Sequence, residues 1–496
     1  MASCPVRRSI CVLALSLSIA AAASAQVPRW ENRGQAEFSG SAQAVDAARG
    51  IVVVAAGVGD ALGNSQWFVR GIDARSGKTV WEDRHGELLF GLAKDVAIEG
   101  DRAFVAGWTY TTGQGFDFVV RAYDVRTGAV AWSQAVSKGP NCVAQVNGSA
   151  RCVAKAVAVA DGRVFVVGHL SRTAARSDFA VIAYDAATGM PLWDSVTDSL
   201  GAGANDYAWA VAVAGDRVFV LGETGNQTGL LLQAHDVHTG AILWRQPLPG
   251  ARTFTLKDTL IADRRQVIIG GSDAAQRFFV RAYDPRTGAL QWDDHLDDGA
   301  GEVSALRLDI ADGDGSDDRD RRTGTEGRRD TRRLVAVGVA GCDPLTSLGC
   351  ALVVRAYDPA RGLLWTAQDH AEGGDWFALS LAAGDGYVGA AGLALLADGI
   401  YHPTIRILDA TTGALRSQIR FDDAPGSAPF GDAGDVFDLT IAHHRLLAAG
   451  HLFRPDEHSD FLVREYRLDG RAPGHDHGDL DDHGGGAIGG DPTRKP

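Results

Sequence analysis

The chain has 496 residues, a formal net charge of −14 and a hydrophobic content of 45%. Because this charge repels phosphate groups, nucleic acid and anionic membrane surfaces are poor partners for it. Its length would allow two or three domains, but an internal repeat predicts one continuous array instead.

The first 25 residues are typical of a cleavable export signal. Arg7 and Arg8 form a charged start, residues 10–22 are apolar, and Ala23-Ser24-Ala25 is a small-residue cleavage site. The apolar stretch is short for a membrane anchor, and no later segment predicts a transmembrane span. We therefore expect a periplasmic or secreted protein, cleaved near Ala25. Subtracting the two arginines from −14 leaves a mature net charge of −16. The arginine pair also permits a twin-arginine export route.

A phrase of the form Ala-Tyr-Asp-x-x-Thr-Gly-x-x-x-Trp returns about every 50 residues. Its aspartates are Asp73, Asp124, Asp185, Asp236, Asp284, Asp358 and Asp409, each followed four residues later by glycine. A tryptophan follows the first five glycines at a further four residues. An aspartate can accept from backbone N–H groups two or three residues on, and glycine supplies the positive φ of a tight turn. We interpret each phrase as strand, turn, strand, with a structural aspartate.

A second hairpin precedes each phrase, as in Val157–Gly168 and again in Val211–Gly222. Each repeat therefore holds four strands. Near the C-terminus, the strand ending at Tyr466 lacks a tryptophan strand after it, whereas Trp30-Glu31-Asn32 lacks a turn phrase before it. The sequence thus predicts an all-β, eight-bladed β-propeller of four-stranded antiparallel blades. The N-terminal strand is expected to complete the last blade and so remove its free edge.

These repeats, from residue 30 to about residue 470, resemble the PQQ-like repeat of quinoprotein alcohol dehydrogenase-like propellers. The resemblance implies either a dehydrogenase, which would hold PQQ with calcium in the central funnel, or a non-catalytic scaffold. The chain lacks the adjacent cysteine pair of the family's dehydrogenases, and no segment matches their calcium-binding or catalytic residues. We expect an exported, monomeric, non-catalytic protein that binds a protein, peptide or glycan. The alternative is a PQQ-dependent dehydrogenase, or another propeller enzyme with a distributed active site.

Four cysteines remain after cleavage, in two close pairs: Cys142 with Cys152, and Cys342 with Cys350. In an exported chain this spacing predicts two local disulfides. A zinc site is a weaker interpretation, because the pairs fall in different blades.

Two segments depart from the repeat. Residues 312–333 are rich in acids and arginines and predict a disordered charged insertion within the propeller, which spans residues 26–472. Inside this insertion, Asp312, Asp314 and Asp318 could wrap a calcium ion, although a plain solvated loop is the simpler interpretation. Residues 473–496 form a Gly-, Asp- and His-rich tail that we also expect to be disordered.

The ligand site is expected where loops lead from each outer strand into the next inner strand, since side chains of several blades converge there. The candidates, at nearly equivalent positions, are Lys94, Asp95, Lys155, Trp209, Lys257, Asp258, Trp376 and Asp438. Lysines beside aromatic rings suit an anionic ligand group. The alternative is that these charges simply neutralise one another around a solvated ring.

Overall fold

The fold is taken from a computed structural model of the chain. The structure describes residues 27–34, 39–60, 62, 64–137, 142, 150–173, 176–197, 205–225, 228–252, 258–309, 333–343, 348–358, 362–421, 435–453 and 459–469. The predicted export signal, most of the charged insertion and the tail lie outside these residues. Arg333, the last residue of the predicted insertion, is already the first residue of a strand.

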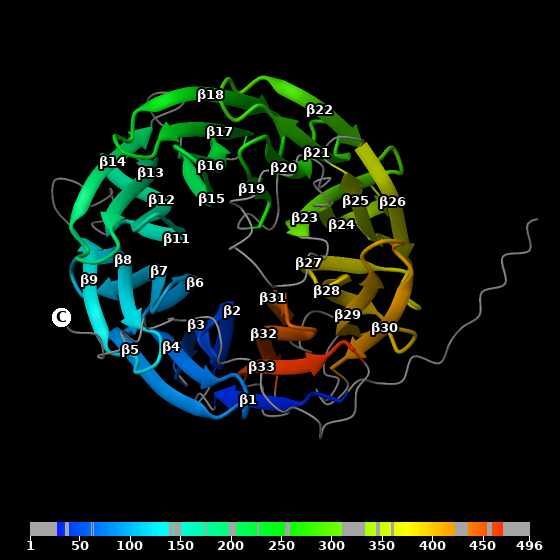
Figure 1. The fold of residues 1–496 in the computed structure, drawn as a ribbon, viewed down its shortest axis with the longest axis horizontal. Helices are drawn as coiled ribbons and strands as arrows, with labels where there is room; N and C mark the ends of the chain where they lie inside the picture. Colours follow the sequence, from blue (N-terminus) through cyan, green and yellow to red (C-terminus); the bar gives the residue numbers. More distant parts are fainter. Residues whose placement is uncertain are drawn as a thin grey trace, which may run out of the picture.

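The described residues form eight antiparallel blades arranged in a ring about a central axis (Figure 1). We call the region around this axis, where the inner strands lie, the channel. The inner strands are β2 (Ser39–Ala48), β6 (Gly91–Glu99), β11 (Val153–Ala160), β15 (Tyr207–Ala214), β19 (Leu260–Ala262), β23 (Ala300–Asp309), β27 (Trp376–Gly384) and β31 (Asp435–Ala442). The second strands are β3 (Ile51–Gly59), β7 (Arg102–Thr111), β12 (Arg163–Thr173), β16 (Arg217–Thr224), β20 (Val267–Ser272), β24 (Arg333–Cys342), β28 (Tyr387–Leu395) and β32 (Arg445–Phe453). The third strands are β4 (Ser65–Asp73), β8 (Gly115–Asp124), β13 (Arg176–Asp185), β17 (Gly229–Asp236), β21 (Phe278–Tyr283), β25 (Ala351–Asp358), β29 (Tyr401–Asp409) and β33 (Ser459–Arg467). The outer strands are β5 (Thr79–Leu89), β9 (Val130–Val136), β14 (Pro191–Thr197), β18 (Ile242–Pro249), β22 (Leu290–His295), β26 (Gly362–Asp369), β30 (Leu415–Arg420) and β1 (Trp30–Gly34).

The ring closes as the sequence predicts. β1 pairs antiparallel with β33, with Trp30 opposite Glu465, so the first strand of the chain is the outer strand of the last blade (Figure 1). Two ion pairs reinforce this junction: Arg464 to Glu31 at 2.7 Å and Arg29 to Glu465 at 2.8 Å. Because closure joins the two ends of the propeller, the last blade has the same four strands as the other blades.

The second blade (β6–β9) differs from the sequence expectation by one added strand. A two-residue strand, β10 (Ala150–Arg151), pairs in parallel with the start of β8 at Gly115 and Phe116. Its sheet therefore has five strands rather than four. β10 lies just before β11, so it fixes the chain as it enters the third blade (β11–β14).

The repeated phrase builds a turn that also locks neighbouring blades together. The Asp124 carboxylate accepts from the Thr127 hydroxyl at 2.7 Å and from the Thr127 N–H at 2.8 Å, and these hydrogen bonds lower its pKa. Gly128 has a φ of 71°, and a Cβ there would lie 2.4 Å from the Trp81 ring. Trp81, from the preceding blade, donates its indole N–H to the Val125 carbonyl at 2.8 Å. Six of the seven repeat glycines are thus needed both for their φ and for the space that an indole fills, whereas nothing lies within 4 Å of a Cβ at Gly362.

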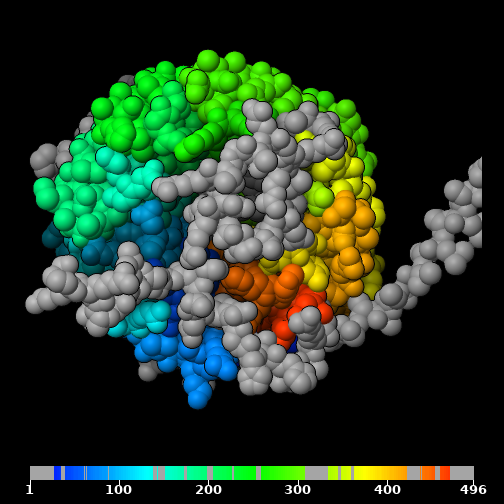
Figure 2. All heavy atoms as spheres, viewed as in Figure 1, coloured from blue at the N-terminus to red at the C-terminus, as the bar shows by residue number. Residues whose placement is uncertain are grey.

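The hydrophobic core is divided among the gaps between blades. One cluster joins Phe104 and Trp132 of the second blade to Val157 and Val166 of the third. Comparable clusters fill the other gaps, and in Figure 2 the coloured blades follow one another around the ring. Stability is therefore distributed over contacts between neighbouring blades. In the part of the chain that the structure describes, no helix has the length and apolar character to cross a bilayer.

Candidate functional site

Seven of the eight inner strands carry a β-bulge at an equivalent place, and this bulge positions the candidate site. The bulged residues are Gln43, Lys94, Lys155, Trp209, Ser304, Leu379 and Phe437. A bulge leaves its residue out of the ladder and re-aims the side chain. Lys94, Lys155 and Trp209 therefore occupy the same structural position in three consecutive blades.

Lys155 is held between two indole rings. Its Nζ lies 4.8 Å from the centre of the Trp108 ring and 4.5 Å from that of Trp209. These rings come from the blades on either side, so three blades build the contact. The ring faces attract an ammonium, but burial and the nearby Lys94 ammonium act in the opposite direction and lower the pKa of Lys155 to about 8.

Lys94 provides the second cation of the site. Its Nζ donates to the Gln43 amide oxygen at 2.6 Å, which links the bulge positions of the first and second blades. The two lysines are close enough for the charge of Lys94 to depress the pKa of Lys155. A ligand anion placed near both would relieve this repulsion.

Two buried polar side chains from second strands complete the site. The His169 ring packs edge-on against the Tyr207 ring, with 4.7 Å between the ring centres. Burial, and after it the charge of Lys155, keeps the pKa of His169 well below its usual range. Burial also raises the pKa of Glu223. We call Lys94, Lys155, Trp108, Trp209, His169 and Glu223 the mouth cluster.

Sequence reasoning missed Trp108, His169 and Glu223. They lie opposite Leu92, Val153 and Tyr207, which puts them at equivalent positions of the second strands in three consecutive blades. An alignment of the second strands of the repeats carries this signal, because the three residues share one position in it.

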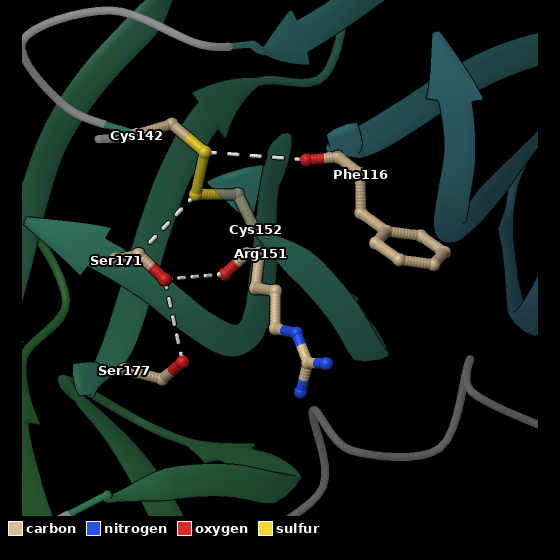
Figure 3. The surroundings of a disulfide bond; sticks show 6 residues. All are labelled: Phe116, Cys142, Arg151, Cys152, Ser171 and Ser177. Atoms are coloured by element: carbon tan, nitrogen blue, oxygen red, sulfur yellow. Dashed lines mark hydrogen bonds between the residues drawn. A yellow bond between two sulfur atoms is a disulfide. The ribbon is translucent and has the colours of Figure 1, made fainter. Parts of the chain in front are cut away.

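A disulfide anchors the segment that carries Lys155. Cys142 and Cys152 are joined, and Cys152 immediately precedes β11 (Figure 3). The Cys152 N–H donates to the Phe116 carbonyl at 3.3 Å, and the Ser171 N–H donates to the Cys152 sulfur at 3.4 Å (Figure 3). The second predicted pair, Cys342 and Cys350, is also joined. Since the first bridge ties β11 to the second blade, it fixes the start of the strand bearing Lys155.

The predicted acidic candidates have a structural role in the channel. Asp95 accepts from the Val157 N–H at 2.9 Å, and Asp438 accepts from the Val45 N–H at 2.9 Å. In each case a carboxylate of one blade caps the unpaired edge of the next inner strand. Such capping satisfies backbone donors that the ring would otherwise leave open.

Arg307 of the sixth blade (β23–β26) ties the channel acids together. Its guanidinium lies 2.9 Å from Asp258 and 3.6 Å from Asp438, in the fifth and eighth blades. Burial lowers the pKa of Arg307, but these carboxylates outweigh that effect and raise it. Asp46 has its pKa raised to about 6 by burial and by the charges of Asp438 and Asp95.

One predicted candidate lies elsewhere, and others fall outside the described residues. Trp376 is fully buried in the core between the sixth and seventh blades, with the Arg406 guanidinium 5.3 Å from its ring. Its ring therefore offers no surface to a ligand. Lys257 lies outside the described residues, as do the calcium candidates Asp312, Asp314 and Asp318.

Comparisons with known proteins find relatives that belong to one family of propellers. The family model described as outer membrane protein assembly factor BamB matches residues 18–180 and 116–321. The quinohemoprotein alcohol dehydrogenase ADH IIB of Pseudomonas putida is 34% identical over 127 residues, which cover 23% of this chain. The matched stretch is only 17% of that enzyme's length.

Solved structures show the same fold at low identity. The quinohemoprotein alcohol dehydrogenase ADHIIG from Pseudomonas putida HK5 superposes with a TM-score of 0.51 at 12% identity, covering 92% of this chain and 78% of that one. A europium-containing methanol dehydrogenase gives a TM-score of 0.53 at 12% identity, covering 89% and 93%. At these identities the likeness establishes the propeller architecture and no activity.

Proposed function

Because this chain belongs to the PQQ-like propeller family that includes the outer membrane protein assembly factor BamB, we propose that it is an exported, non-catalytic binding propeller. Its mouth cluster would recognise an anionic group, such as a carboxylate, on a protein, peptide or glycan. The predicted export signal and the two disulfides support a periplasmic or secreted location. We propose that it acts as a monomer.

The observation that carries the proposal is the pair of lysines at one structural position in adjacent blades. Among the described residues, no carboxylate forms an ion pair with Lys155, whose contacts are the two indoles. Two ammonium groups held side by side destabilise each other's charged form, and an anion near both would stabilise both charges. Asp95 and Asp438 each accept from a backbone N–H group of the neighbouring inner strand.

The test is a comparison of two variants against a screen of carboxylated and neutral ligands. Lys94→Ala with Lys155→Ala should lower affinity for a carboxylated ligand by about 10- to 100-fold, the cost of about 1.5–3 kcal/mol for a lost charged hydrogen bond. The melting temperature should change little. The matched control, Asp124→Ala with Asp185→Ala, removes turn contacts on the opposite face. It should lower the melting temperature and leave affinity intact; the reverse pattern would refute the proposal.

The second candidate function is a PQQ-dependent dehydrogenase, which the dehydrogenase relatives favour. The indoles and lysines of the mouth cluster would suit an aromatic polycarboxylate. Calcium, however, requires several oxygen ligands, and nowhere in the described ranges do three His, Cys, Asp or Glu side chains gather closely enough to hold a metal ion. The described residues therefore offer no cluster of acidic ligands for the calcium ion. Incubation with PQQ and calcium tests this alternative: stoichiometric cofactor absorbance with dye-linked alcohol oxidation would establish it.

A further inference from the structure

The chain uses lysine sparingly, and half of its lysines are mouth candidates. Only six of its 48 basic residues are lysines, and Lys94, Lys155 and Lys257 are three of them. Arginine binds anions at least as well as lysine and keeps its charge at all physiological pH values. Of these two residue types, only lysine can lose its proton and then attack a carbonyl carbon.

The surroundings of Lys155 are those that favour a free amine. Its bulge position directs the side chain out of the ladder, and two indoles from neighbouring blades lie against its Nζ. The Lys94 ammonium adds like-charge repulsion, and the pKa of Lys155 falls to about 8. Desolvation combined with a neighbouring cation is a known way to activate a lysine nucleophile.

We propose that Lys155 captures its ligand covalently, by reversible imine formation with an oxo acid, that is, an aldehyde or ketone that also carries a carboxylate. The Lys155 nitrogen bonds to the carbonyl carbon, and the amine proton passes to the oxygen to give a carbinolamine. Loss of water from the carbinolamine leaves the imine, so amine and carbonyl give imine and water. Lys94 would hold the carboxylate, so this inference rests on the proposed anion site.

The experiment is reductive trapping with sodium cyanoborohydride, followed by peptide mass mapping. The probes are glyoxylate, which has both groups, and propanal, which has no carboxylate. Acetate, which has no carbonyl, is used as a competitor. At pH 7, a pKa near 8 gives about 300-fold more free amine than the ordinary 10.5. A weaker base is also a weaker nucleophile, so we expect roughly 10-fold or more faster labelling of Lys155 than of the exposed Lys78.

Two substitutions test the roles of Lys155 as the nucleophile and of Lys94 as the anion contact. Lys155→Arg keeps the charge but cannot form an imine, so the adduct on that peptide should vanish. Lys94→Met removes the like charge and the anion contact, so glyoxylate labelling should slow and shift to higher pH, and acetate should no longer compete. If either variant fails to fold, mapping of the wild-type protein still tests the inference through the ratio of Lys155 to Lys78.

The outcomes separate the two proposals. Acetate binding detected by titration calorimetry, without an adduct on Lys155, would overturn imine capture and leave anion binding in place. Neither acetate binding nor an adduct would overturn both. Equal labelling by propanal and glyoxylate would overturn the preference for an oxo acid.

Discussion

Removing the Trp30 side chain should weaken the closure of the ring. Trp30 is 8% exposed, donates its indole N–H to the Ala74 carbonyl at 3.0 Å and packs over Gly77, where a Cβ would lie 2.7 Å from the ring. Truncating a buried tryptophan to alanine costs about 3–5 kcal/mol. We therefore expect Trp30→Ala to lower the free energy of unfolding by about that amount in reversible urea denaturation followed by circular dichroism.

The matched control is Trp132→Ala, which has the same exposed fraction of 8% and donates to the Ala186 carbonyl at 3.0 Å. Both variants should lose similar stability. Only Trp30→Ala should loosen β1, so only there should the amides of residues 461–465, which pair with β1, exchange faster with solvent. A cost below about 1 kcal/mol, or unchanged exchange in that strand, would refute closure by β1 as a source of stability.

Three further predictions concern the disulfides, the mouth and the channel. Removing either disulfide by paired Cys→Ser substitution should cost about 2.5 kcal/mol in the loop-entropy model for separations of 10 and 8 residues, and an unchanged urea midpoint would contradict it. When the protein binds a carboxylate at pH 8 it should take up as much as about half a proton, because the free Lys155 is half protonated at that pH. Binding enthalpies measured by calorimetry that are equal in buffers of different ionisation enthalpy would rule this out. The raised pKa of Asp46, about 6, means that its contribution to stability falls as pH rises from about 4 to 6. Relative to wild type, the melting temperature of Asp46→Asn should therefore rise over that pH interval. A difference in melting temperature that stays constant with pH would exclude the effect.

The sequence by itself determined the architecture, because each repeated turn is specified by residues only a few positions apart in the chain. An aspartate that bonds its own turn, a glycine that needs positive φ, and a tryptophan at fixed spacing specify a hairpin wherever they occur. Asp124 and Gly128 make the contacts that their spacing predicts. Counting third and outer strands then gave eight blades and the closing role of β1. Both disulfides follow from short separations along the chain.

The tertiary structure alone decided which side chains meet at the mouth. Trp209 and Trp376 occupy nearly equivalent places in their repeats, yet Trp209 is the bulged residue of its strand, whereas Trp376 precedes the bulged Leu379 by three residues. Side chains alternate between the faces of a strand, so a shift by an odd number of residues sends a side chain to the other face. For the same reason Asp95, one residue after the bulged Lys94, caps the backbone of the next blade instead of facing a ligand. The position of a bulge depends on how inner and second strands pair, and that pairing is a property of the folded blade.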